Sequence, residues 1–224
     1  MGKRGAKPKG KVKIKWSPNF AYGIGLLVTD GCLSGDGRHI DFTSKDKEQI
    51  DNFLKAFHIV VSVGLKDRGD LNQAFRVQFG DVLFYRFLLE IGITPAKSLT
   101  LDKIKIPDEY FFDFVRGCFD GDGYSYSYWD KRWKSSFMFY IGFASASKKY
   151  IDWFRSTVSR LAGLAGHITK ATRNNSCHQL KYAKREAIEL FSRMHVRNKC
   201  IRLSRKYLKI KETLAIVGGL SGRT

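Results

Sequence analysis

Two aspartates at matching places in a repeated pattern are the residues best suited to chemistry. Asp30 and Asp122 each follow an apolar segment and precede a glycine, in Gly25–Gly31 and Gly117–Gly123. An acid at the negative, C-terminal end of a helix is disfavoured by about 0.3–1 kcal/mol, so two such acids favour a compensating cation. Carboxylate and phosphate oxygens are typical Mg²⁺ ligands. Two metal ions on one phosphodiester form a hydrolytic arrangement.

The segments that must position these acids are repeated along the chain. His39–Phe53 aligns with Tyr140–Phe154, with seven identical residues in fifteen positions. The offset between the two copies grows from 92 to 101 residues between Tyr124 and Tyr140, which places nine extra residues there. A longer hairpin is the simplest account of them. One Asp-Gly pair alone is an ordinary turn signal, but two pairs at equivalent repeat positions favour a functional site.

Each copy has the same predicted order of helices and hairpins. An apolar helix ends at the Asp-Gly pair, where a glycine suits a left-handed C-terminal cap. A hairpin follows, and then come an amphipathic helix (46–57 and 147–161), a second hairpin (about 60–80 and 165–183) and another helix (81–91 and 184–195). If the copies pack about a pseudo-two-fold axis, Gly25 and Gly117 let the apolar helices approach closely. The two acids then converge.

The charge of the chain indicates a polyanionic partner. The 224 residues carry a net charge of +19, and residues 1–15 and 197–211 each hold seven basic residues and no acidic one. Such clusters favour phosphate contact and argue against an enzyme for cationic substrates. The four cysteines have no paired spacing, and no apolar stretch is long enough for a membrane span. We therefore expect an intracellular, soluble protein with reduced thiols and no membrane partner.

The second hairpin of each copy alternates apolar residues with polar or basic ones. Arg76 and Gln78 alternate with phenylalanine and valine, as Gln179 and Lys181 do with leucine and tyrosine. Arg and Gln side chains read guanine and adenine edges in the major groove, although an ordinary solvated face is the alternative interpretation. The candidate DNA contacts are Arg38, Ser62, Lys66, Arg68, Arg76, Gln78, Lys131, Arg132, Lys134, Arg173, Gln179 and Lys181.

These features resemble the LAGLIDADG homing endonucleases in their two-repeat, single-chain form. Gly23–Gly31 (GIGLLVTDG) and Val115–Gly123 (VRGCFDGDG) match the two copies of the family nonapeptide, and the resemblance covers roughly residues 19–211. It implies an α+β fold, in which two pseudo-symmetric αββαββα repeats form antiparallel β saddles around a central pair of helices. We expect a basic N-terminal arm (1–18), two repeats (19–106 and 107–211) and a C-terminal tail (212–224).

The resemblance also implies roles for individual residues. It implies Asp30, Asp122, Thr29 and Gly121 as metal ligands, Lys97 and Lys199 as phosphate-polarising catalytic lysines, and Ser44 and Ser145 in the water network. A helix N-cap role suits the two serines equally well. The implied cofactor is Mg²⁺, with Mn²⁺ or Ca²⁺ able to take the same sites. Asp120 has Val28 as its counterpart, so we interpret it as accessory or solvated.

The implied activity is a metal-dependent double-strand break in a long, asymmetric DNA site, made by a monomer. The protein would be intron-encoded or free-standing, with intron RNA as a second candidate partner. The alternative is a binder of the same fold that does not cleave, either an intron RNA maturase or a DNA-binding regulator. The two acids and two lysines favour the enzyme. The aromatic segment Tyr124–Trp133 is interpreted as an extended hairpin that touches phosphate, with base stacking as the alternative.

Overall fold

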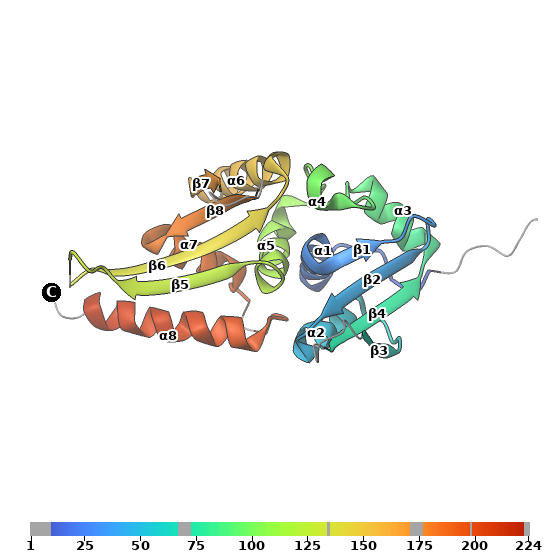
Figure 1. Cartoon of the computed structure of the whole chain (residues 1–224), viewed down its shortest axis with the longest axis horizontal. Helices are drawn as coiled ribbons and strands as arrows, with labels where there is room; N and C mark the ends of the chain where they lie inside the picture. Colours follow the sequence, from blue (N-terminus) through green and yellow to red (C-terminus); the bar gives the residue numbers. More distant parts are fainter. Residues whose placement is uncertain (1–9, 67–72, 134, 171–176, 198, 222–224) are drawn as a thin grey trace, which may run out of the picture.

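The fold consists of two similar halves joined side by side (Figure 1). The computed structural model describes residues 10–66, 73–133, 135–170, 177–197 and 199–221. In order, the elements are α1 (Pro18–Asp30), β1 (Gly31–Leu33), β2 (His39–Ser44), α2 (Lys47–Phe57), β3 (Val63–Lys66), β4 (Ala74–Gly80), α3 (Val82–Glu90), α4 (Lys97–Thr100), a 3-10 turn (Asp108–Tyr110), α5 (Phe111–Asp120), β5 (Tyr124–Trp129), β6 (Phe137–Ser145), α6 (Lys148–Ala162), β7 (His167–Lys170), β8 (His178–Ala183), α7 (Lys184–Met194) and α8 (Ser204–Ser221).

Each half holds one antiparallel sheet of four strands. The strand orders are β1-β2-β4-β3 and β5-β6-β8-β7, so the predicted αββαββα repeat occurs twice. The first hairpin of the second half is the longer one, because β5 and β6 have 6 and 9 residues where β1 and β2 have 3 and 6. The structure thus confirms the fold class, the repeat and the hairpin extension inferred from the sequence.

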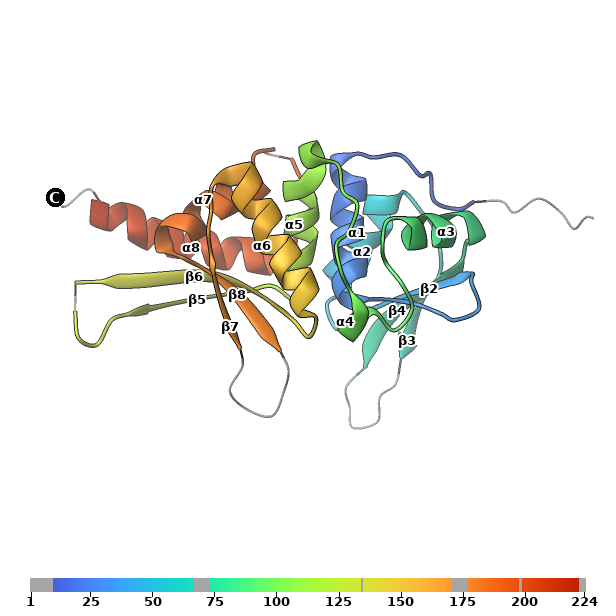
Figure 2. The same ribbon diagram turned by 90° about the horizontal axis from the view of Figure 1, so that it is seen from above.

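Helices cover one face of each sheet, and the other faces point to the same side of the molecule (Figure 2). We call these uncovered faces the open faces. In β4, Val77 and Phe79 are buried beneath helices, whereas Gln78 is exposed on the open face. The predicted alternation would bury the apolar residues of β3. They are not buried, since Val63 and Leu65 are 39% and 62% exposed. β3 is an edge strand, with only β4 as a neighbour.

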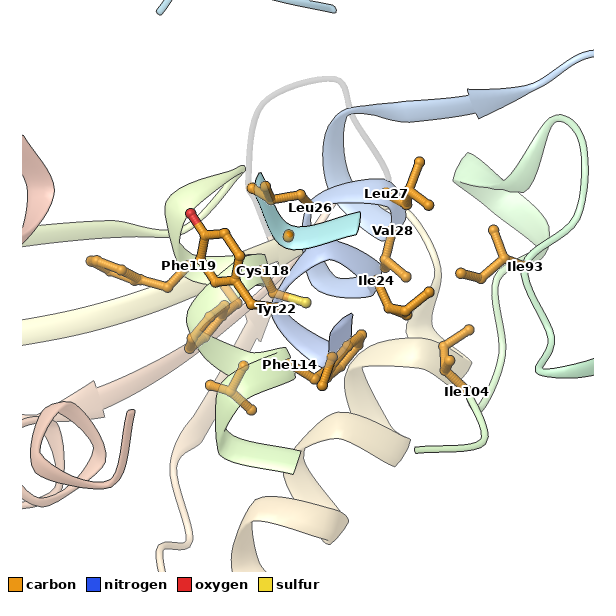
Figure 3. Packing of buried hydrophobic residues seen from close by; sticks show 14 of the residues in the cluster. Tyr22, Ile24, Leu26, Leu27, Val28, Ile93, Ile104, Phe114, Cys118 and Phe119 are labelled. Carbon is orange, nitrogen blue, oxygen red and sulfur yellow. The ribbon is translucent and has the colours of Figure 1, made fainter. Parts of the chain in front are cut away.

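The two halves meet along α1 and α5, the helices that carry the acids. A Cβ atom on Gly25 would lie 2.3 Å from Phe114 O, and one on Gly117 would lie 2.1 Å from Tyr22 O. Only glycine permits this approach of the two backbones. Figure 3 shows apolar side chains of both helices gathered around the contact. The predicted close packing of the two helices is therefore confirmed.

The helix ends differ from expectation in detail. Gly31 follows α1 in an extended conformation, with φ −83°, so it is not the left-handed cap that we predicted. The glycine is needed there because a Cβ atom would lie 2.6 Å from the Leu27 side chain. The N-caps of α2 and α6 are Asp46 and Ser147. Ser44 and Ser145 lie two residues earlier in the chain and are therefore not the caps.

The chain ends also depart from the predicted division. Residues 10–17 pack against the first half, since the backbone N–H groups of Lys11 and Val12 donate to Asp81 Oδ2 at 2.6 and 2.9 Å. This part of the expected arm lies on the helix-covered side, away from the open faces (Figure 2). The boundary expected after residue 211 falls inside α8. That helix continues because Thr213 and Val217 are buried.

The four cysteines are free thiols. No helix in the described part of the chain is long and apolar enough to cross a membrane.

Candidate functional site

The two repeat acids lie together at the seam between the halves. Asp30 is the last residue of α1, and Asp122 stands two residues beyond the end of α5. The turn that carries Asp122 abuts the other acid, since a Cβ atom on Gly121 would lie 2.7 Å from Asp30 Oδ2 and 2.0 Å from Thr29 Oγ1. Both helices end on the side of the open faces (Figure 2). The convergence expected from the repeat is thus present.

The two carboxylates differ in their surroundings. Asp30 is partly buried, and burial raises its pKa to about 6, with a further increase from the negative charge of Asp122. Gln49 Nε2 donates to Asp30 Oδ2 at 2.9 Å and opposes that increase, as does the Thr29 hydroxyl at 3.3 Å. Asp122 is exposed. A place where one negative charge raises the pKa of a neighbouring carboxyl is a place where a cation is stabilised.

Gln49 is a site residue that the sequence reasoning missed. It lies in the first turn of α2, and its buried amide also accepts from Ser44 Oγ at 2.7 Å. Ser44 therefore reaches Asp30 through Gln49. In the second half, Ser145 Oγ accepts from Ser147 N at 3.1 Å, and Ser145 lines the same cavity as Asp122. A glutamine at the start of the helix that follows the first hairpin was the available signal, although Tyr150 stands at the equivalent position of the second half.

Lys97, the first of the two predicted catalytic lysines, lies beside the acid pair. Its side chain is buried, and Nζ donates to the carbonyl of Gly31, directly after Asp30. Burial lowers the pKa of Lys97, while the charges of Asp30 and Asp122 act in the opposite direction. A cavity of about 120 Å³ lies beside it, lined in part by Thr29, Lys97, Asp122 and Ser145. The cavity has room for water next to both a carboxylate and an ammonium group.

In the second half, Lys206 takes the place that we expected for Lys199. Lys199 is exposed, in a loop after α7. Lys206, on α8, donates from Nζ to the carbonyls of Phe119, Gly121 and Gly123, each at 2.7 Å. Gly123 follows Asp122 as Gly31 follows Asp30, so Lys206 is the geometric counterpart of Lys97. Burial lowers the pKa of Lys206 to about 8, against the charges of nearby aspartates.

Thr29 and Gly121, the other expected metal ligands, form hydrogen bonds within the protein. The single proton of the Thr29 hydroxyl can go to Leu26 O at 3.0 Å or to Asp30 Oδ2 at 3.3 Å, and the Gly121 carbonyl accepts from Lys206. Among the described residues, no three His, Cys, Asp or Glu side chains gather around one point. Asp30 and Asp122 can therefore supply only some of the oxygen ligands that a divalent ion needs. The remaining ligands would come from water and from a bound phosphate, which is how Mg²⁺ is commonly held.

Asp120 was expected to be accessory or solvated, and the structure shows that it is not solvated. It is buried, and its Oδ2 accepts from Tyr22 Oη at 2.8 Å and from Leu203 N at 2.7 Å. Burial raises its pKa to about 6, while these hydrogen bonds act in the opposite direction. Asp120 thus ties α1, α5 and the segment before α8 together beneath the acid pair. It supports the site from inside.

The candidate DNA contacts on β4 and β8 lie on the open faces, because they alternate along these strands with buried residues. Arg76 is paired with Asp41, its neighbour on the open face, so its guanidinium is not free for a base. Gln78 is exposed, and Gln179 Oε1 accepts from Tyr124 Oη at 3.4 Å. Of the remaining candidates, Arg38, Ser62, Lys66, Lys131 and Arg132 are exposed and Lys181 is half-buried, whereas Arg68, Lys134 and Arg173 lie outside the described residues.

Comparison with solved structures identifies the fold. The homing endonuclease I-LtrWI bound to target DNA is 11% identical and superposes with a TM-score of 0.59 over 92% of this chain and 91% of that chain. I-WcaI bound to its DNA recognition sequence is 16% identical, with a TM-score of 0.57 over 80% of each chain. The N-terminal LAGLIDADG domain of DUF199/WhiA is 12% identical, with a TM-score of 0.55 over 82% and 85%.

The chain has the LAGLIDADG fold. No protein-family model and no curated protein matches it in sequence. The LAGLIDADG likeness extends over both halves, so it agrees with the duplication seen in the sequence and in the sheets.

Proposed function

We propose that this protein is a site-specific endonuclease that makes a metal-dependent double-strand break in a long, asymmetric DNA site. The observation that carries this proposal is the meeting of Asp30 and Asp122 at the ends of α1 and α5, between two open sheet faces. An acid from each half, at a seam that faces outward, suits the two scissile phosphates of a duplex. The net charge of +19 favours a nucleic acid as the partner.

The divalent ion would be held by the carboxylates of Asp30 and Asp122, with Mg²⁺ as the first choice and Mn²⁺ or Ca²⁺ as alternatives. When bound, such an ion supplies charge stabilisation for the phosphodiester and favours ionisation of a water molecule. The carboxylate oxygens of Asp30 and Asp122 are hard donors, which is the donor chemistry that these ions prefer.

The protein's own groups have separate tasks in this proposal. Gln49 holds the Asp30 carboxylate in place and favours its ionised form. The ammonium groups of Lys97 and Lys206 are each held by the backbone carbonyl of the glycine that follows an acid. There they can neutralise charge that develops on a phosphate. Ser44 orients the Gln49 amide, and Ser145 lines the cavity next to Asp122. The sheets bind and orient the duplex, and we expect a monomer to suffice.

A binder that does not cleave, of DNA or of intron RNA, is the second candidate. One contact favours this second candidate. The Lys206 ammonium group donates a hydrogen bond to the Gly121 carbonyl, which is the oxygen next to Asp122 that was expected to bind the metal ion. In this alternative, Asp30 and Asp122 would remain as part of the packing between the halves.

A cleavage and binding screen separates the two candidates. The full chain is incubated with a randomised duplex DNA library, once with Mg²⁺ and once with a chelator. The endonuclease proposal predicts one family of sites cut on both strands, only when Mg²⁺ is present. A site that is enriched by binding and never cut favours the second candidate. No enrichment by either route contradicts the endonuclease and the DNA binder, and a parallel selection from a randomised RNA library then tests the RNA binder.

A further inference from the structure

The extended hairpin of the second half carries an unusual row of tyrosines. Tyr124, Tyr126 and Tyr128 alternate along β5, and Tyr140 lies opposite Tyr126 on β6. We call these four residues the tyrosine row. On β6, the residues that flank Tyr140, Phe139 and Ile141, are buried beneath helices, so the row lies on the open face. Its position is that of the proposed DNA-binding surface.

The rings of the row are stacked on one another. The Tyr126 and Tyr140 centroids are 4.8 Å apart with an interplanar angle of 15°, and Tyr124 and Tyr128 flank Tyr126 at 6.2 and 6.3 Å. The glycine opposite Tyr124, Gly142, makes room for the first ring, because a Cβ atom there would lie 2.4 Å from Tyr124 Cζ. Since ring faces are occupied by other rings, the row offers edges and hydroxyl groups rather than a platform for stacked bases.

The row continues the polar surface that begins near the acids. Tyr124 Oη donates to Gln179 Oε1 at 3.4 Å, and Gln179 and Lys181 follow on the neighbouring strand β8. At its outer end the hairpin turn carries Lys131 and Arg132, both exposed. Two side chains that could contact base edges, Gln179 and Lys181, thus lie at the inner end of the row, and two cations lie at its outer end. This arrangement suits a surface laid along a DNA groove.

The first half has no counterpart to this extension. β5 and β6 have 6 and 9 residues, whereas β1 and β2 have 3 and 6, so each strand is three residues longer in the second half. At about 3.3 Å per residue the extension adds roughly 10 Å. That length corresponds to about three base pairs of B-DNA, which are 3.4 Å apart along each strand.

We propose that the tyrosine row reads the major-groove edges of the outer base pairs in one half of a duplex DNA target. This inference rests on the proposed function of the site. The phenolic hydroxyls donate to or accept from base edges, and the ring edges provide apolar contact for thymine methyl groups. The target is therefore longer on the side bound by the second half, by about three base pairs.

The test compares the full chain with a variant in which Tyr126, Tyr128 and Tyr140 are replaced by phenylalanine. Phenylalanine keeps the stacked rings and removes only the hydroxyls. The matched control is Ser127→Ala, on the same strand and on the opposite face. Each protein selects sites from a randomised duplex DNA library in Ca²⁺. The wild-type complex is also mapped by hydroxyl-radical footprinting.

We expect the variant to lose base preference at three or four consecutive positions at one end of the site, by about fivefold per hydroxyl. The control should keep the wild-type preference, and the footprint should reach about three base pairs farther on that side of the centre. An unchanged preference, or a symmetric footprint on a site that the wild type does select, overturns the tyrosine row alone. If the wild type selects no DNA site, the proposed function fails and this inference fails with it.

Discussion

The substitution Gly117→Ala tests the packing that brings the acids together. A Cβ atom at this position would lie 2.1 Å from Tyr22 O, where ordinary contact begins at 3.4 Å, so α1 and α5 must separate by about 1.3 Å. Overpacking of this kind lowers the free energy of unfolding by about 1–3 kcal/mol. Because two backbones oppose each other here and neither can rotate away, we expect a loss of about 3 kcal/mol. The better helix propensity of alanine offsets about 1 kcal/mol of that cost. We expect a net loss of about 2 kcal/mol in urea unfolding.

The same separation displaces the site, and a misplacement of about 1 Å can reduce catalysis about 100-fold. The matched control is Gly218→Ala, another helical glycine, which has open space where the Cβ would lie. That change should raise the free energy of unfolding by about 0.5–1 kcal/mol. If Gly117→Ala is as stable and as active as the wild type, the reasoning about the helix contact is refuted.

Three further changes probe the electrostatics. Gln49→Ala removes a hydrogen bond from ionised Asp30, so the pKa of Asp30 should rise above about 6 in an NMR titration of the metal-free protein; a fall contradicts this. Because the pKa of Lys206 is about 8 in the folded chain and 10.5 ordinarily, the folded state loses this proton first as the pH rises. The free energy of unfolding should therefore rise between those pH values in the wild type, and Lys206→Met should abolish its share of the rise; equal slopes would contradict the assignment. Asp41→Ala frees Arg76 from its ion pair, so the base preference at one position of the selected DNA site should sharpen, and an unchanged preference would contradict a base-reading role for Arg76.

Local patterns in the sequence were sufficient to predict the repeat and the acids. Apolar spacing and turn residues predicted the helices and hairpins of the two αββαββα repeats nearly to their ends, because these signals lie within a few residues of one another. Gly25 and Gly117 pointed to a close helix contact for the same reason, since two equivalent glycines on apolar helices have few other uses.

Contacts between distant segments could not be predicted in this way. Lys206 reaches the carbonyls around Gly121 from the last helix of the chain, and no local pattern says where that helix packs. Asp120 is acidic and looked solvated, yet its partners Tyr22 and Leu203 come from other parts of the fold. The pairing of Arg76 with Asp41 depends on the register of β2 against β4, which the alternation alone does not give.

The most direct test of the account measures cutting and binding by Asp30→Asn and Asp122→Asn on a site selected by the wild type. Asparagine keeps the size of each side chain and removes its charge, and Asp51→Asn, on the exposed side of α2, is the control. We predict that both variants bind the site like the wild type and fail to break both strands in Mg²⁺, while the control cuts normally. Wild-type double-strand cutting by either variant would contradict the assignment of the acid pair.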